Sequence, residues 1–146
     1  MAKSQLDMVI RMAVERRDEA AQRLADGQAA VRAAQEQVDQ LTQYQQMYIE
    51  QNQQQSTRGI SVQALSESRR FIGELSNLIR AQQDTVSARE RDAEGLAEAW
   101  REATRYLQAV EKLSELRANE AKVARDKREQ QQMDDLYSQR MGQTKD

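Results

Sequence analysis

The sequence predicts an all-α protein, a long antiparallel two-helix coiled coil (α-hairpin) with a C-terminal helical or frayed overhang. Two observations predict this fold. Apolar or small residues recur in alternate steps of four and three from Leu6 to Tyr48 and again from Leu65 to Leu107, and such a seven-residue repeat is typical of a coiled-coil seam. The polar segment from Asn52 to Gly59 separates the two runs. A short polar link between two such helices predicts that they are antiparallel neighbours.

Each seam is defined by its residues. The first seam comprises Leu6, Ile10, Ala13, Arg17, Ala20, Leu24, Gly27, Val31, Ala34, Val38, Leu41, Gln45 and Tyr48. The second comprises Leu65, Ser68, Ile72, Leu75, Ile79, Gln82, Val86, Arg89, Ala93, Leu96, Trp100, Ala103 and Leu107. A reversal of the chain near Ser56 sets a register in which Val38 faces Leu75 and Gly27 faces Val86. Small residues then meet large ones, which lets knobs fill holes at a constant helix separation.

The predicted boundaries make residues 1–146 a single elongated domain, with a first helix over about 4–55, a link over about 53–60 and a second helix over about 61–140. Ser4 with Asp7 resembles a capping box at the start of the first helix. Gly59 can adopt the left-handed conformation that ends a helix, and Ser61 can cap the next one.

The composition narrows the classes of function. There is no Pro, which suits uninterrupted helices, and there is no His or Cys, which removes the commonest catalytic base, thiol nucleophile and soft metal ligands. We therefore expect no enzyme, no catalytic residue, no metal, no cofactor and no small-molecule substrate. The net charge is −2 with both signs interspersed, which argues against nucleic acid. The apolar runs are too short for membrane insertion.

A stripe rotated from the second seam exceeds what a hairpin needs. Phe71, Leu75, Leu78 and Gln82 are spaced four, three and four. Two interpretations remain open: the stripe packs over the edge of the seam, or it docks a partner, since an exposed Phe beside Leu is a usual interface anchor.

The ends of the chain carry a second candidate surface. Met8, Val9 and Met12 flank the first seam, and methionine-rich faces adapt to partners. About thirty residues at the C-terminus have no pairing partner, and there the apolar positions thin out to Val123, Met133, Leu136 and Tyr137. This overhang either frays or receives its missing surface from another protein.

The order of several short segments along the chain resembles the FliJ family, the small coiled-coil proteins of the flagellar type III export apparatus. These segments are Tyr44-Gln-Gln-Met-Tyr48, Gly59-Ile-Ser61, Phe71-Ile-Gly-Glu-Leu75, Trp100-Arg-Glu102 and Met133-Asp-Asp135. The resemblance covers nearly the whole chain and rests on order and spacing, since no single motif is diagnostic.

The resemblance implies a non-enzymatic stalk and escort. Its implied partners are the hexameric export ATPase FliI, the export gate protein FlhA and the flagellar export chaperones. Its implied location is cytoplasmic, with peripheral association to the inner membrane at the flagellar base. The implied gate-binding residues are Phe71, Leu75, Leu78 and Gln82, although the family usually has a smaller third residue and a ring-bearing polar fourth one. The ATPase-binding residues map coarsely to Met8, Val9, Met12, Met133, Leu136 and Tyr137.

Two alternatives remain beside this interpretation. The chain could be the equivalent stalk of a virulence type III secretion system. It could also be a generic self-associating coiled-coil adaptor, with Phe71 and Leu78 in an interface between two copies.

Overall fold

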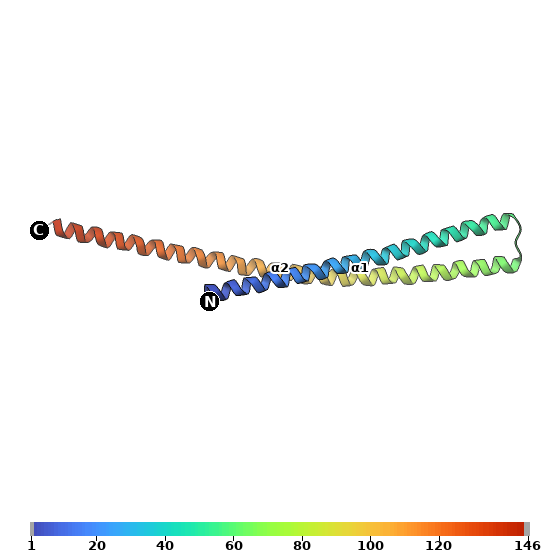
Figure 1. The fold of residues 1–146 in the computed structure, drawn as a ribbon, viewed down its shortest axis with the longest axis horizontal. Helices are drawn as coiled ribbons and strands as arrows, with labels where there is room; N and C mark the ends of the chain where they lie inside the picture. Colours follow the sequence, from blue (N-terminus) through green and yellow to red (C-terminus); the bar gives the residue numbers. More distant parts are fainter. Residues whose placement is uncertain (1, 145–146) are drawn as a thin grey trace. The chain divides into compact units, whose positions relative to one another are not determined.

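The computed structural model describes residues 2–144, which form helix α1 (Lys3–Thr57) and helix α2 (Val62–Thr144) and contain no strand (Figure 1). The chain divides into two parts. The hairpin part is Asp18–Arg101, and the terminal part comprises the described residues of 1–17 and 102–146. Within the hairpin part, α1 and α2 lie side by side and antiparallel (Figure 1). The predicted α-hairpin coiled coil is confirmed.

The buried residues follow the predicted seams. Among the described residues, the buried hydrophobic ones are Leu6, Ala13, Ala34, Val38, Leu75, Val86, Ala103 and Leu107, and all of them are seam positions. In the hairpin part, Ala34, Val38 and Val86 form one cluster against which Ile79 packs. Burial of this narrow stripe, more than intrinsic propensity, stabilises helices of this length.

The link joins the helices as its residue types predict. Gly59 has φ of 82°, in the left-handed region that glycine enters without steric cost. Its N–H donates to the Ser56 carbonyl at 3.2 Å, which satisfies one of the last orphan acceptors of α1. The Ser61 hydroxyl accepts from the N–H of Ala64 at 3.1 Å, so Ser61 is the N-cap of α2.

The start of α1 differs from its prediction. The helix begins at Lys3, and the Leu6 N–H donates to the Ala2 carbonyl at 3.0 Å. The Gln5 side chain accepts from the Ala2 N–H at 3.3 Å, which is the returning half of a capping box. The proposed Ser4–Asp7 box is therefore wrong, because the helix starts before Ser4.

The register of the hairpin part also differs from its prediction. A Cβ on Gly27 would lie 3.7 Å from Ala93 Cα and 2.6 Å from Leu96 Cδ1, so Gly27 faces Ala93 and not Val86. Val86 instead clusters with Ala34. The two arms are thus displaced by one heptad, about seven residues, from the predicted register. The reversal is centred at the link itself, because α1 runs on to Thr57.

Polar bonds between the helices hold this register. The Gln45 amide donates to Ser76 Oγ at 2.7 Å and to the Ile72 carbonyl at 3.1 Å. Ser68 Oγ donates to Asn52 Oδ1 at 3.1 Å. A displacement by one heptad would separate both pairs, and it would leave part-buried polar groups without these partners, which is costly. The predicted register, in which Gln45 would face Ser68, is wrong here, because Gln45 bonds Ser76 and Ser68 bonds Asn52.

The outer faces carry ion pairs within single helices. Arg101 donates to Glu94 at 2.8 Å and to Glu98 at 3.0 Å. These two carboxylates raise the pKa of the Arg101 guanidinium above its usual value, so it stays charged at every pH that the folded protein meets. Exposed pairs of this kind contribute little to stability.

The helical glycines provide a test of the close contact at Gly27. Gly73→Ala and Gly95→Ala are each expected to raise the free energy of unfolding by about 1 kcal/mol, since an added Cβ meets nothing within 4 Å. Gly27→Ala is expected to gain less or to lose stability, because its Cβ would displace the Leu96 side chain. Thermal or urea unfolding of the three variants measures the difference. An equal gain in all three would contradict the close packing at Gly27.

Candidate functional site

The four residues of the predicted gate-binding stripe lie in different environments. Leu75 is buried, at 4% exposure, as part of the seam. Leu78 is 55% exposed. Gln82 is half-buried and donates to Gln37 Oε1 on α1 at 2.8 Å. The stripe is therefore not one continuous exposed surface, and Leu78 is its most accessible apolar member.

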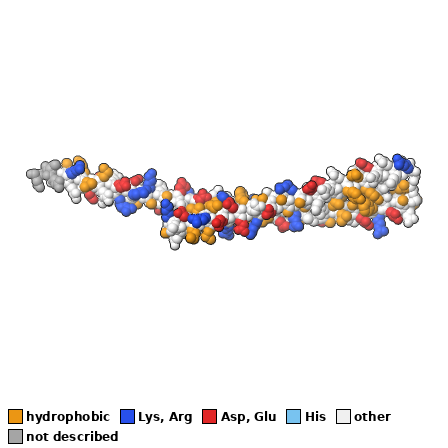
Figure 2. Space-filling view, in the orientation of Figure 1, with side chains coloured by type: hydrophobic (Ala, Val, Ile, Leu, Met, Phe, Trp, Pro, Cys, Tyr) orange, Lys and Arg blue, Asp and Glu red, His pale blue; other side chains and the backbone are white. Residues whose placement is uncertain are grey.

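Phe71, on α2, packs against two tyrosines of α1. Its ring packs edge-on against Tyr48, with centroids 4.7 Å apart, and against Tyr44 at 6.5 Å. Tyr44 remains 52% exposed. We call Tyr44, Phe71 and Leu78 the aromatic patch. Figure 2 shows hydrophobic side chains gathered on the hairpin part toward the link.

Sequence reasoning missed the contribution of α1 to this patch. The seam pattern includes Tyr48, and Tyr44 enters the sequence analysis only through the family resemblance. The spacing of the two tyrosines could have indicated this contribution, because Tyr44 and Tyr48 are four residues apart and share a helix face. The one-heptad error in register hid the proximity of Tyr48 to Phe71, because the predicted register places Phe71 about six residues away from Tyr48.

The predicted ATPase-binding residues form two separate groups within the terminal part. Met8 and Met12 of α1 are 60% and 63% exposed, and Val9 is half-buried between them. On α2, the exposed residues Met133, Leu136 and Tyr137, with Arg140, line a surface hollow of about 320 Å³. The second group lies along a segment of α2 that continues past the start of α1 (Figure 1), so the structure does not bring the two groups into one patch.

This segment of α2 is exposed throughout. Every residue from Glu115 to Gly142 is exposed, whereas Ala103 and Leu107, earlier in the same part, are buried together with Leu6 and Ala13. We call residues 115–142 the projecting segment. It corresponds to the overhang that the sequence predicts, and it is helical along its whole length.

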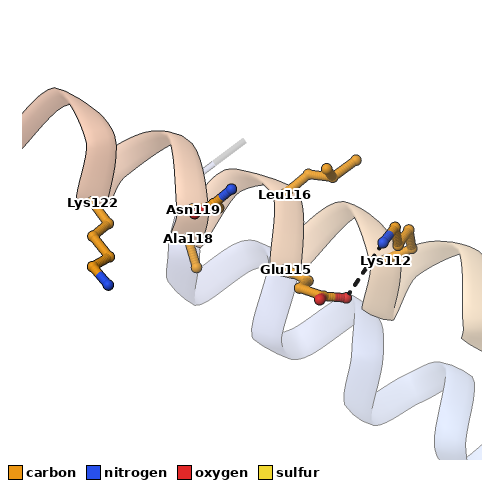
Figure 3. A pocket seen from close by; sticks show the side chains of 6 residues that line it. All are labelled: Lys112, Glu115, Leu116, Ala118, Asn119 and Lys122. Atoms are coloured by element: carbon orange, nitrogen blue, oxygen red, sulfur yellow. Dashed lines mark ion pairs between the residues drawn. The ribbon is translucent and has the colours of Figure 1, made fainter.

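A second hollow, of about 480 Å³, lies where the projecting segment begins. Figure 3 shows that all six lining side chains come from α2 and that Leu116 points away from Lys122. The ammonium of Lys112 is already paired with Glu115 at 3.8 Å. Because the side chains diverge, the hollow offers no convergent polar groups for a small ligand.

The exposed apolar groups among the described residues suit contact with another protein. Within residues 2–144, no cluster of three potential ligands could hold a metal ion. In the same range, neither helix has a stretch long and apolar enough to cross a bilayer. The accessible chemistry consists of apolar patches and mixed surface charge, which is the chemistry of a protein interface.

The fold and these surfaces define a class of protein: a two-helix coiled-coil binding protein whose candidate sites are exposed apolar groups on its helices. The model of the flagellar FliJ protein family matches residues 2–145. The chain belongs to this family, which is a family of non-catalytic components associated with flagellar protein export. No curated protein and no solved structure matches the chain.

Proposed function

We propose that this chain is the stalk and escort component of the flagellar export apparatus. In this role it links the hexameric ring of the export ATPase FliI to the export gate protein FlhA and handles flagellar export chaperones. The ring would contact the terminal part, and the gate would contact the aromatic patch. The protein would work in the cytoplasm, at the inner-membrane face of the flagellar base.

One observation carries the proposal. Helix α2 is continuous from Val62 to Thr144, and it presents exposed apolar groups in both parts, at Leu78 and at Met133 through Tyr137. A coiled coil that served only as a spacer would need neither group, because exposed apolar side chains at a helix surface lower solubility without adding to the seam.

The aromatic patch suits a protein partner. Phe71 is held at its edge by Tyr44 and Tyr48, so little of its side-chain freedom remains to be lost on binding. Leu78 is exposed on the same face of α2, two helical turns further along. Partly preorganised aromatic anchors of this type carry much of the free energy of protein association.

Leu78→Ala is expected to weaken binding to the export gate protein by about 10-fold or more, because truncation of an interface anchor costs about 2 kcal/mol. The free energy of unfolding should change by less than about 0.5 kcal/mol, since Leu78 is at the surface. Titration calorimetry with the purified gate protein measures the affinity, and urea unfolding measures stability.

Leu116→Ala is the matched control for this experiment. Leu116 is also an exposed leucine of α2, at 48%, but it lies in the terminal part. It should leave binding to the gate unchanged. If Leu78→Ala and Leu116→Ala bind the gate equally well, the aromatic patch is not the gate-binding surface.

A further inference from the structure

The projecting segment exposes an apolar stripe that α1 does not cover. Leu116, Val123, Gln130 and Tyr137 recur every seventh residue, and Met141 follows Tyr137 by one turn. At about 100° per residue these five positions share one helix face. The apolar members are 48–65% exposed. We call these five residues the terminal stripe.

The charges along the projecting segment are distributed unevenly about Gln130. Residues 116–129 contain five basic and three acidic residues, whereas residues 131–142 contain two acidic residues and one basic residue. One half is therefore net positive and the other net negative. Figure 2 shows Lys and Arg side chains gathered in one stretch of this segment, with hydrophobic ones nearer its C-terminal end.

This polarity favours one kind of covering helix. A helix of the same sequence laid parallel would place the basic half against the basic half. The same helix laid antiparallel places basic against acidic at both ends, and charge complementarity of this kind sets the orientation of coiled-coil partners. Most of the stability of helices in proteins comes from packing of an apolar face, so a covering helix would stabilise the projecting segment.

We propose that the terminal stripe is an interface for a second copy of this chain, with the two projecting segments antiparallel about a two-fold axis at Gln130. Val123 of each copy then packs against Tyr137 of the other. Lys127 and Asp134 border the stripe on the same side. Lys127 of each copy therefore lies opposite Asp134 of the other copy. The two Gln130 amides meet at the axis, where each can both donate and accept.

This self-pairing does not rest on the proposed function, and it adds to it. Tyr137 belongs both to the terminal stripe and to the proposed ring-binding group. A paired copy therefore has Tyr137 covered, and pairing competes with ring binding for this residue.

The first test measures the molar mass of the full chain by sedimentation equilibrium. The mass is expected to rise from 16.8 kDa toward twice that value between about 10 μM and about 1 mM protein. Lys127→Glu or Asp134→Lys alone should weaken the association about 3-fold to 10-fold, and the two together should restore it. A monomer at every concentration, or no restoration by the double variant, would overturn the proposal.

The second test uses single cysteines for orientation, since the chain has none of its own. Under mild oxidation, Gln130→Cys should form a disulfide-linked dimer. A mixture of Val123→Cys and Tyr137→Cys should form the mixed dimer, whereas each of these two variants alone should not cross-link. Efficient cross-linking of each variant with itself would show parallel pairing, and cross-linking of none of them would show that the stripe is not the interface. Either result overturns the proposal, and neither bears on binding to the gate or the ring.

Discussion

Leu75→Ala is expected to lower the free energy of unfolding by about 2–5 kcal/mol. Leu75 is buried at 4% exposure, and it belongs to a seam only one side chain wide on each helix. A two-helix coiled coil has no other layer that could collapse into the cavity, so the loss should fall in the upper part of this range. Urea unfolding followed by circular dichroism measures it.

Leu78→Ala makes the same chemical change three residues along the same helix, and it serves as the control. Because Leu78 is exposed, its loss should cost less than about 0.5 kcal/mol. Equal losses at the two positions would contradict the placement of Leu75 in the seam. The contrast also matters for function, since weak gate binding by Leu75→Ala would report unfolding rather than a lost contact.

Replacement of Met133, Leu136 and Tyr137 together by glutamine is expected to weaken binding to the export ATPase ring by about 100-fold. These residues are 60–71% exposed, and glutamine keeps the helix propensity close to that of methionine and leucine. The loss would therefore arise from the removed apolar contacts. Binding to the purified ATPase, and the stimulation of its ATP hydrolysis, are the measurements, made well below the concentration at which the chain self-associates.

Two further variants complete that experiment. Met8→Gln with Met12→Gln tests whether the start of α1 also contacts the ring. Val62→Gln is the control, because Val62 is 85% exposed and lies at the link. Unchanged ring binding by both terminal variants would remove the terminal part from the proposed function, while the aromatic patch would still be open to its own test.

The sequence was sufficient for the fold class because the pattern is redundant. Many heptad positions must be apolar or small for a seam to persist, so a few polar ones, such as Gln45, do not obscure it. The link was equally readable. Gly59 and Ser61 have local conformational and capping preferences that do not depend on distant contacts, and the structure confirms both.

The aromatic patch was only partly predictable. Periodicity on α2 located Phe71 and Leu78, and it also showed that Leu75 borders the seam. It placed Leu75 in the seam and Leu78 outside it, and the structure buries the first and exposes the second. How far Phe71 is covered depends on the packing of the other helix. The close contact of Tyr48 with Phe71 depends on the register between the helices, which periodicity leaves open.

The sequence by itself determined that two helices meet along two particular faces, and which residues lie on those faces. Only the tertiary structure decided the register. A displacement of one heptad leaves every seam residue facing another seam residue, so the hydrophobic pattern is nearly indifferent to it. The choice is made by contacts without that seven-residue symmetry: the left-handed Gly59 at the reversal, the bonds of Gln45 and Asn52 across the seam, and the close approach of Leu96 to Gly27.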